Sequence, residues 1–307
     1  MRGRRLVFAA IATVLIVWLM RTAPPPRPLY PIHEPPPTTE LGAAFDPARC
    51  GIVRGEVRWS GDVPAVAPIE LVRVRNPPAG MKHVSNPNVP RITGGRLADA
   101  VVRLIGIEAA RSAPWPEPVP TTSVEVTRTA LVVKQGGQAG RVAVVRRGQE
   151  VELVALEDVD TATSLATVHS VRGRGAAFFT QMLATANRPV SRPMPEAGVV
   201  ELSSGAGYYW LRGYLFVSDD PYAAVTGGDG TFSLNQVPDG EYEAVCWVPN
   251  WHIERWEHDP EWSGDPVRLF FKPAVEKRQR LAVKAGQVSD LHFTFSAADF
   301  DRGAHPP

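Results

Sequence analysis

The chain has almost no net charge. Its 33 Lys and Arg side chains are balanced by 32 Asp and Glu side chains, which leaves a formal charge of +1 over 307 residues. Basic residues also do not gather in a run interleaved with aromatic residues, as they do at many nucleic-acid interfaces. The sequence therefore predicts that the protein does not bind nucleic acid.

The common catalytic motifs are missing. The sequence has no G-x-S-x-G nucleophile elbow, no phosphate-binding P-loop and no strand-bound G-x-G-x-x-G. The segment "WHIERWEHDPEWSGD" (251–265) is rich in His, carboxylates and Trp, but it lacks the H-E-x-x-H of zinc peptidases. A cation or sugar site is one interpretation of this segment, and a charged loop whose Trp rings cover a sandwich edge is the other. We expect neither an enzyme nor a bound cofactor.

Long helical periodicity is absent outside the N-terminus. The first residues, "MRGRR", precede an apolar run from Leu6 to Met20, and small residues of the A-x-A kind do not follow it. We expect residues 1–21 to be an uncleaved signal anchor, with a cleaved signal peptide as the alternative. This predicts a single-pass protein of the cytoplasmic (inner) membrane with its folded part on the periplasmic side. The Pro-rich residues 22–45 are expected to form a stiff polyproline II linker.

Short runs rich in β-branched residues fill the rest of the chain. Examples are "CGIVRGEVRW" (50–59), "GRVAVVRRG" (140–148), "EVELVAL" (150–156) and "GVVELSS" (198–204), each bounded by turn-forming residues. They predict an all-β fold, with one short helix at 178–188 and a long loop at 76–91 that wraps over the core. Residues 46–220 are assigned to a first β-sandwich that includes the N-terminal strands.

A second unit is expected from residue 221 to 297. Asp229-Gly230 and Asp239-Gly240 are turn pairs that tolerate positive φ, and they lie between alternating strands. This pattern predicts a small antiparallel sandwich of the transthyretin or immunoglobulin kind. The tail, 298–307, is expected to be disordered.

The order of these segments carries a family resemblance. "RVAVVRRGQEVELVAL", "HSVRGRGAAFF", "AGVVELSS" and "YYWLRGYLFVSDDPYAAVTGGDGTFSLNQVPDGEYEAVCW" occur in succession. This succession resembles bacterial exported proteins that join a plastocyanin-like (cupredoxin) domain to a carboxypeptidase regulatory-like, transthyretin-like domain. The resemblance implies a cupredoxin-like sandwich followed by a second, accessory sandwich.

The resemblance also implies where copper ligands would stand. Type 1 copper requires two imidazoles, a thiolate and a weak axial thioether. His169 occupies the position of the first His, whereas Gly205, Tyr208 and Leu211 stand where the family has Cys, His and Met. We therefore expect degenerate ligands and no metal. His169 is interpreted as a structural residue, with a different metal site as the alternative, and Tyr208, Tyr209 and Trp210 either fill the core or form an aromatic platform for a ligand.

The two cysteines remain open to two interpretations. Export exposes Cys50 and Cys246 to oxidising conditions, so they are a candidate disulfide, and closing so long a loop would contribute about 4 to 5 kcal/mol. The alternative is a metal site that includes Cys246 and His252 in "CWVPNWH", although a second ligand pair at zinc-finger spacing is missing.

Together these features predict a non-catalytic binding or structural module of the cell envelope. The membrane and an envelope protein or glycan are the expected partners. A periplasmic metal-binding or electron-transfer protein with a nonstandard site is the first alternative. An enzyme that acts on envelope polysaccharide is the second.

Overall fold

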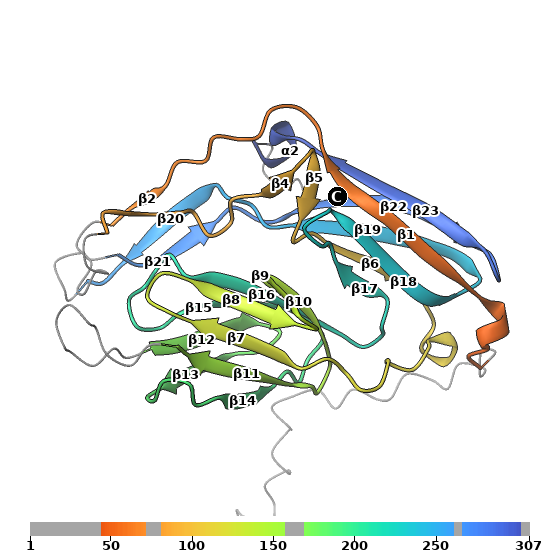
Figure 1. The fold of residues 1–307 in the computed structure, drawn as a ribbon, viewed down its shortest axis with the longest axis horizontal. Coiled ribbons are helices and arrows are strands. Elements are labelled where there is room, and N and C mark those ends of the chain that lie inside the picture. The colour runs from red at the N-terminus through yellow and green to blue at the C-terminus, as the bar shows by residue number, and fades with distance from the viewer. Residues whose placement is uncertain (1–43, 72–80, 157–168, 261–265, 302–307) are drawn as a thin grey trace, which may run out of the picture. The chain divides into compact units, whose positions relative to one another are not determined.

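The computed structural model describes residues 44–71, 81–156, 169–260 and 266–301. The predicted anchor and nearly all of the predicted linker lie outside this part of the chain. Within it, strands dominate, and the all-β prediction is confirmed (Figure 1). No helix in the described ranges is long and apolar enough to cross a membrane.

The first sandwich consists of two five-stranded sheets, with strand orders β14-β11-β7-β8-β9 and β10-β16-β15-β12-β13. Each sheet contains one parallel pair, β7 with β11 and β10 with β16. The ten strands are β7 (Thr122–Val126), β8 (Leu131–Gln135), β9 (Gln138–Gly140), β10 (Val142–Arg146), β11 (Glu150–Ala155), β12 (His169–Gly175), β13 (Phe179–Leu183), β14 (Val190–Pro193), β15 (Gly198–Ser204) and β16 (Arg212–Ser218).

The second sandwich draws its strands from both sides of the first in sequence. Its sheets have the orders β18-β1-β5-β4, with β23 also paired to β1, and β17-β6-β19-β22. In Figure 1 the orange β1 accordingly lies beside the blue β23. The strands are β1 (Cys50–Trp59), β4 (Arg91–Thr93), β5 (Arg96–Ala98), β6 (Val101–Ile105), β17 (Ala223–Val225), β18 (Thr231–Pro238), β19 (Gly240–Val248), β22 (Val275–Val283) and β23 (Val288–Phe295).

This pairing divides the chain differently from the boundary predicted at residue 220. β1 pairs with β18 and β23, and β6 pairs with β17 and β19, so the N-terminal strands belong to the second sandwich. Close approach of β1 to β23 depends on Gly55, where a Cβ atom would lie 1.7 Å from the Leu291 carbonyl oxygen. Residues 122–218 are thus an insertion between β6 and β17.

Three apolar cores hold the four sheets together. One core fills each sandwich, and a third joins them through Val142, Val144, Tyr214 and Phe216 of the first sandwich and Val101 and Trp247 of the second. Along β16, Leu215 and Val217 face the first sandwich's own core, while Tyr214 and Phe216 face the second sandwich. A strand buried on both faces is a continuous apolar run, and this explains "GYLFV".

Three local predictions differ from the structure. The expected helix at 178–188 is replaced by β13, whose exposed edge position alternates exposed and partly buried residues. The turn at Asp239 and Gly240 does not close a hairpin, because β18 and β19 lie in different sheets. In the tail, residues 298–301 belong to helix α2 (Ala297–Asp301), which Phe300 anchors in a cluster with Trp59 and Trp251.

The remaining elements cover the sandwiches. β2 (Ile69–Glu70) pairs with β3 (His83–Val84), and β20 (Ile253–His258) pairs with β21 (Pro266–Phe271) as a hairpin. In sequence, the hairpin lies between β19 and β22, which both belong to the second sandwich. Its Leu269 side chain is nevertheless part of the first sandwich's core. Two short 3-10 turns, η1 (Pro47–Arg49) and η2 (Ala109–Arg111), complete the fold.

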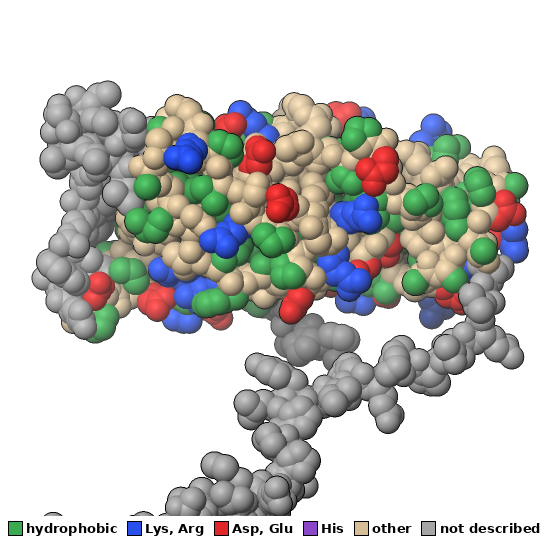
Figure 2. All heavy atoms as spheres, turned by 90° about the horizontal axis from the view of Figure 1, so that it is seen from below, with side chains coloured by type: hydrophobic (Ala, Val, Ile, Leu, Met, Phe, Trp, Pro, Cys, Tyr) green, Lys and Arg blue, Asp and Glu red, His purple; other side chains and the backbone are tan. Residues whose placement is uncertain are grey.

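One face of the molecule carries charges of both signs. Figure 2 shows hydrophobic, basic and acidic side chains interspersed among the described residues of that face. A surface of this kind does not produce the one-sign field that attracts a polyanion.

Candidate functional site

The residues predicted to replace copper ligands meet at one end of the first sandwich. His169 begins β12 and is fully buried, and the loop between β15 and β16, which contains Gly205, Tyr208 and Leu211, places the Tyr208 ring beside it. The amide of Gly205 donates a hydrogen bond to the Ser170 carbonyl oxygen at 2.9 Å. The loop is tightened by a turn in which the Leu211 amide donates to the Tyr208 carbonyl at 3.0 Å.

Aromatic rings fill this end of the core in a continuous series. The ring centroids of His169 and Tyr208 are 5.7 Å apart, those of Tyr208 and Trp210 are 5.6 Å apart, and those of Trp210 and Tyr209 are 5.0 Å apart. Edge contacts of this kind add to the stability that buried aromatic area provides. Tyr209 also contacts Trp256 of β20, so the hairpin covers the series.

Hydrogen bonds fix the polar ends of two of these rings. The indole Nε1 of Trp210 donates to the Arg128 carbonyl oxygen at 3.0 Å, and the Tyr209 hydroxyl donates to the Glu70 carbonyl oxygen at 3.3 Å. Tyr208, Tyr209 and Trp210 are each at most 5% exposed. Their faces therefore pack in the core and are not a platform open to a ligand from solvent.

The positions converge, but their side chains do not form a copper site. A Cβ atom added to Gly205 would lie 2.6 Å from the Ser170 Oγ atom, so a cysteine here requires the hydroxyl to move. Tyr208 and Leu211 supply a phenol and an isobutyl group in place of an imidazole and a thioether. Among the described residues, no group of three or more His, Cys, Asp or Glu side chains is placed to hold a metal ion.

The second set of metal candidates is separated. Cys246 of β19 points into the second sandwich's core, where burial raises the pKa of its thiol. His252 instead lies near the surface, with its Nε2 atom 3.1 Å from Asp301 Oδ1 and its ring 5.2 Å from that of Trp251. The structure does not bring the thiol and the imidazole together as ligands.

The candidate disulfide is not formed. Cys50 begins β1 and its thiol donates a hydrogen bond to the Asp46 carbonyl oxygen at 3.3 Å, whereas Cys246 is fully buried in the opposite sheet. Both cysteines are free thiols. Burial is the main reason that the pKa of the Cys50 thiol is also raised.

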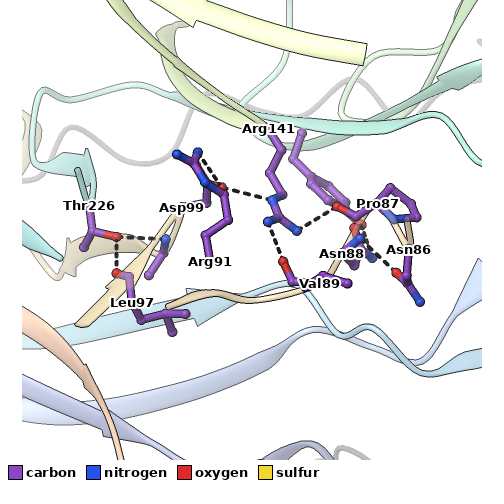
Figure 3. Close-up of polar contacts among 11 residues, drawn as sticks. Asn86, Pro87, Asn88, Val89, Arg91, Leu97, Asp99, Arg141 and Thr226 are labelled. Carbon is purple, nitrogen blue, oxygen red and sulfur yellow. Dashed lines mark hydrogen bonds and ion pairs between the residues drawn. The ribbon is translucent and has the colours of Figure 1, made fainter. Parts of the chain in front are cut away.

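Sequence analysis missed a polar centre between the two sandwiches (Figure 3). Arg141, just before β10, donates to Asp99 Oδ2 at 3.0 Å, to the Pro87 carbonyl at 2.7 Å and to the Val89 carbonyl. Arg91 pairs with the same Asp99 carboxylate at 3.2 Å. We call Asp99, Arg91 and Arg141 the Asp99 centre.

The strap, residues 85–90, threads this interface. Asn86 donates to the Trp251 carbonyl at 2.9 Å, and Asn88 donates to the Tyr214 hydroxyl at 2.9 Å and to the Asn250 carbonyl at 2.8 Å. Within the predicted loop 76–91, the described strap is therefore a connector between the sandwiches, with Asn86 and Asn88 buried; residues 76–80 lie outside the described residues. The two Asn residues in "SNPNVP" could have indicated this role, because Asn side chains form hydrogen bonds with backbone groups in turns.

A polar cavity of about 240 Å³ adjoins the Asp99 centre. Asp99 lies at its edge with a φ of 60°, a left-handed conformation uncommon for a residue with a side chain. The Asp99 amide donates to the Thr226 carbonyl at 3.2 Å, which holds this conformation. The exposed Gln138 of β9 lines the opposite part of the cavity.

A second centre missed by sequence analysis lies under the β20–β21 hairpin. Arg212 of β16 and Arg268 of β21 both donate to Glu201 Oε1 at 2.6 Å. Arg212 donates in addition to the Leu269 carbonyl oxygen at 2.6 Å, so it also ties the hairpin to the sheet. We call Glu201, Arg212 and Arg268 the Glu201 centre.

Comparisons with known proteins give structural similarity alone. No protein-family model matches the chain, and no curated protein matches it. A copper-containing nitrite reductase from Thermus scotoductus is similar over 38% of this chain and 25% of its own, with 15% identity and a TM-score of 0.25. The chain thus spans a quarter of that enzyme's length.

Two small copper proteins are also similar. A purple cupredoxin from Nitrosopumilus maritimus matches over 27% of this chain and 84% of its own, with 17% identity and a TM-score of 0.21. The oxidised form of an amicyanin mutant matches over 35% of this chain and 99% of its own, with 15% identity and a TM-score of 0.23. Similarity at this level assigns no activity to the chain.

Proposed function

We propose that this protein is a non-catalytic module of the cell envelope, anchored to the cytoplasmic membrane by its N-terminal segment, in which a cupredoxin-like sandwich has no copper site. The observation that carries the proposal is the aromatic series beside His169. Tyr208, which stands at the position of the second His, packs against the His169 ring, and Trp210 packs against Tyr208. A buried phenol and indole supply neither the thiolate nor the second imidazole that type 1 copper requires.

The second sandwich supports a binding or structural role. It is proposed to be the transthyretin-like accessory unit. Its strands β6 and β17, which precede and follow the inserted sandwich in sequence, pair with each other. The interface between the sandwiches is closed by an apolar core and by the Asp99 centre. This rigid arrangement suits a module that presents a fixed surface to an envelope protein or glycan.

Copper binding tests the proposal directly. The full chain is purified in detergent without chelators, exposed to Cu²⁺, and analysed for metal content and visible absorption. We expect no stoichiometric copper and no intense thiolate-to-copper band. A strong band in the unaltered protein would contradict the proposal and would favour a periplasmic electron-transfer protein.

A rebuilt site provides the matched control. Gly205→Cys, Tyr208→His and Leu211→Met restore the three missing ligand types around His169, and Ser170→Ala removes the hydroxyl that a Cβ at 205 would meet. The combined variant is expected to bind copper and absorb strongly, whereas the same variant with Gly205 retained is not. A folded, colourless combined variant would show that these positions are not the counterparts of copper ligands.

The partner requires a separate measurement. Pull-downs from envelope extracts and from purified envelope glycans, with the full chain as bait, are expected to retain a macromolecule. A chain that retains nothing while glycan fragments are released would instead favour the polysaccharide-active alternative.

A further inference from the structure

The outer face of the β10-β16-β15-β12-β13 sheet carries rows of charged side chains at one end. Along β12, Arg172 and Arg174 alternate with Val171, which faces the core. In the strand register, Arg172 lies opposite Ser203 and Ser203 lies opposite Arg212, while Arg174 lies opposite Glu201. Side chains directly opposite each other on one face have Cβ atoms about 5 Å apart. Arg174 and Arg212 therefore neighbour Glu201 on this face, and Arg172 lies two residues away from Arg174 along β12.

The β20–β21 hairpin adds a fourth arginine. Arg268 shares the Glu201 Oε1 atom with Arg212, and its guanidinium lies 4.3 Å from the centre of the Phe270 ring. Glu257 lies opposite Arg268 in the hairpin, and its charge acts on Arg174. Arg255 also lies over the Phe270 ring, at 3.5 Å. Among the described residues named here, two carboxylates, Glu201 and Glu257, lie with a larger number of guanidinium groups.

Several donors of these arginines are buried without a partner. Within the described residues, Nε and Nη1 of Arg268, Nε of Arg212 and Nε of Arg174 have no hydrogen-bond acceptor. Arg268 and Arg212 are only 6% and 2% exposed. Buried cationic donors are costly unless an acceptor or an opposite charge satisfies them. The pKa of Arg174 is lowered, first by desolvation and then by repulsion from Arg268 and Arg172.

We infer that this cluster, Arg172, Arg174, Arg212 and Arg268, binds a small oxyanion beside Glu201. A planar guanidinium presents parallel donors that match two oxygens of a phosphate or carboxylate. Arg268, Arg212 and Arg174 supply the buried donors, and Arg172 and Arg174 are the members of the cluster that are partly exposed to solvent. Glu201 alone does not satisfy the cluster, because Arg212 and Arg268 both use its Oε1 atom. This inference is independent of the proposed function.

Titration of the full chain in detergent with inorganic phosphate tests the site. At constant ionic strength, phosphate is expected to raise the melting temperature along a saturating curve and to give a binding isotherm in calorimetry, because a ligand of the folded state stabilises it. Sodium chloride is the control for screening. Acetate and sulfate separate carboxylate from phosphate-like recognition. A melting temperature that does not respond to any of the oxyanions would overturn the inference.

Substitution of the exposed arginines locates the anion. Arg174→Gln and Arg172→Gln are each expected to weaken phosphate binding about tenfold, the effect of one lost charge-assisted hydrogen bond. Arg54→Gln is the matched control, since Arg54 is an exposed arginine paired with Asp290 in the second sandwich. Equal phosphate affinity in all three variants and the unaltered chain would show that the cluster is only structural. Arg268→Gln is expected to abolish binding, and if it does not fold, the two exposed variants decide.

Discussion

The Asp99 centre and the Glu201 centre each consist of one carboxylate that pairs with two arginines. They differ in how many of the arginines' hydrogen-bond donors have an acceptor. In the Asp99 centre, Arg141 directs its guanidinium to Asp99 and to two backbone carbonyls of the strap, and Asp99 is buried. In the Glu201 centre, both arginines are buried while the Glu201 side chain is 33% exposed, and buried donors remain without acceptors.

The difference separates a structural centre from a binding centre. A buried arginine with an acceptor at each of its three nitrogens, such as Arg141, holds two elements together. A buried arginine with unused donors, next to other arginines, favours an additional anion. The same residue types thus serve the interface between sandwiches in one place and the proposed oxyanion site in the other.

Removing Arg141 should have the largest effect on stability. Arg141→Met leaves Asp99 with only the half-exposed Arg91 and leaves two strap carbonyls unpaired, so we expect unfolding in urea to show a loss of about 3 to 5 kcal/mol. Arg91→Met serves as the control and is expected to cost less than about 1 kcal/mol, because an exposed partner is screened by solvent. Equal effects of the two substitutions would contradict the division of roles.

In the Glu201 centre, loss of the carboxylate should reduce stability more than loss of one arginine. Glu201→Gln removes a shared carboxylate from two buried arginines, and we expect a loss of about 2 to 3 kcal/mol in phosphate-free buffer, reduced from the fully buried case by partial exposure. Arg268→Met removes one excess charge and is expected to change stability by less than about 1 kcal/mol. Urea unfolding measures the stability of both variants. A large loss of stability in Arg268→Met would contradict the expectation that Arg268 adds an excess charge to the Glu201 centre.

Tyr214 lies between the centres and provides a smaller, pH-dependent test. Burial raises the pKa of its phenol to about 12, from an ordinary value near 10. Above pH 10 the unfolded chain releases this proton before the folded chain does, so the stability that Tyr214 provides is present below pH 10 and falls as the pH rises toward 12. The expected loss at pH 11 is on the order of 1 kcal/mol.

The control for this test is Tyr214→Phe. The variant loses the hydrogen bond to Asn88 at every pH, but its stability should decline less steeply between pH 10 and 11 than that of the unaltered chain. Since the pKa values of Tyr222 and Tyr242 are also raised, the difference between the two slopes isolates Tyr214. Identical slopes would show that Tyr214 is not buried at the interface.

Local alternation of residues predicted many strands, but it did not predict their partners. The runs at 50–59 and 198–204 coincide with β1 and β15, because β-branched residues at every second position fit a pleated strand. The pairing of β1 with β23 depends on contacts between residues more than 200 positions apart, which no local pattern encodes. The strand order, and with it the insertion of residues 122–218, therefore emerged only in three dimensions.

The candidate site was predictable in part for the same reason. The resemblance to cupredoxin proteins singled out the loop 205–211 and His169, and the structure places Tyr208 of this loop beside His169. Arg141, Asp99, Arg212 and Glu201 were not identified, because a charged residue at a strand end usually faces solvent. Only the stacking of one sheet on another, and of the hairpin on a sheet, buries Asp99 and Arg212 and pairs them with Arg141 and Glu201.

The parallel pairing of β1 with β23 has a consequence for biogenesis. During synthesis, residues 122–218 contain every strand of their two sheets, so these sheets can form before β23 has been made. β1 has to wait, because its partner Val288–Phe295 is among the last residues to emerge. A chain truncated before β23 would therefore leave Val53 and Val57 of β1 uncovered, and β1 would be exposed to proteases that cleave unfolded segments.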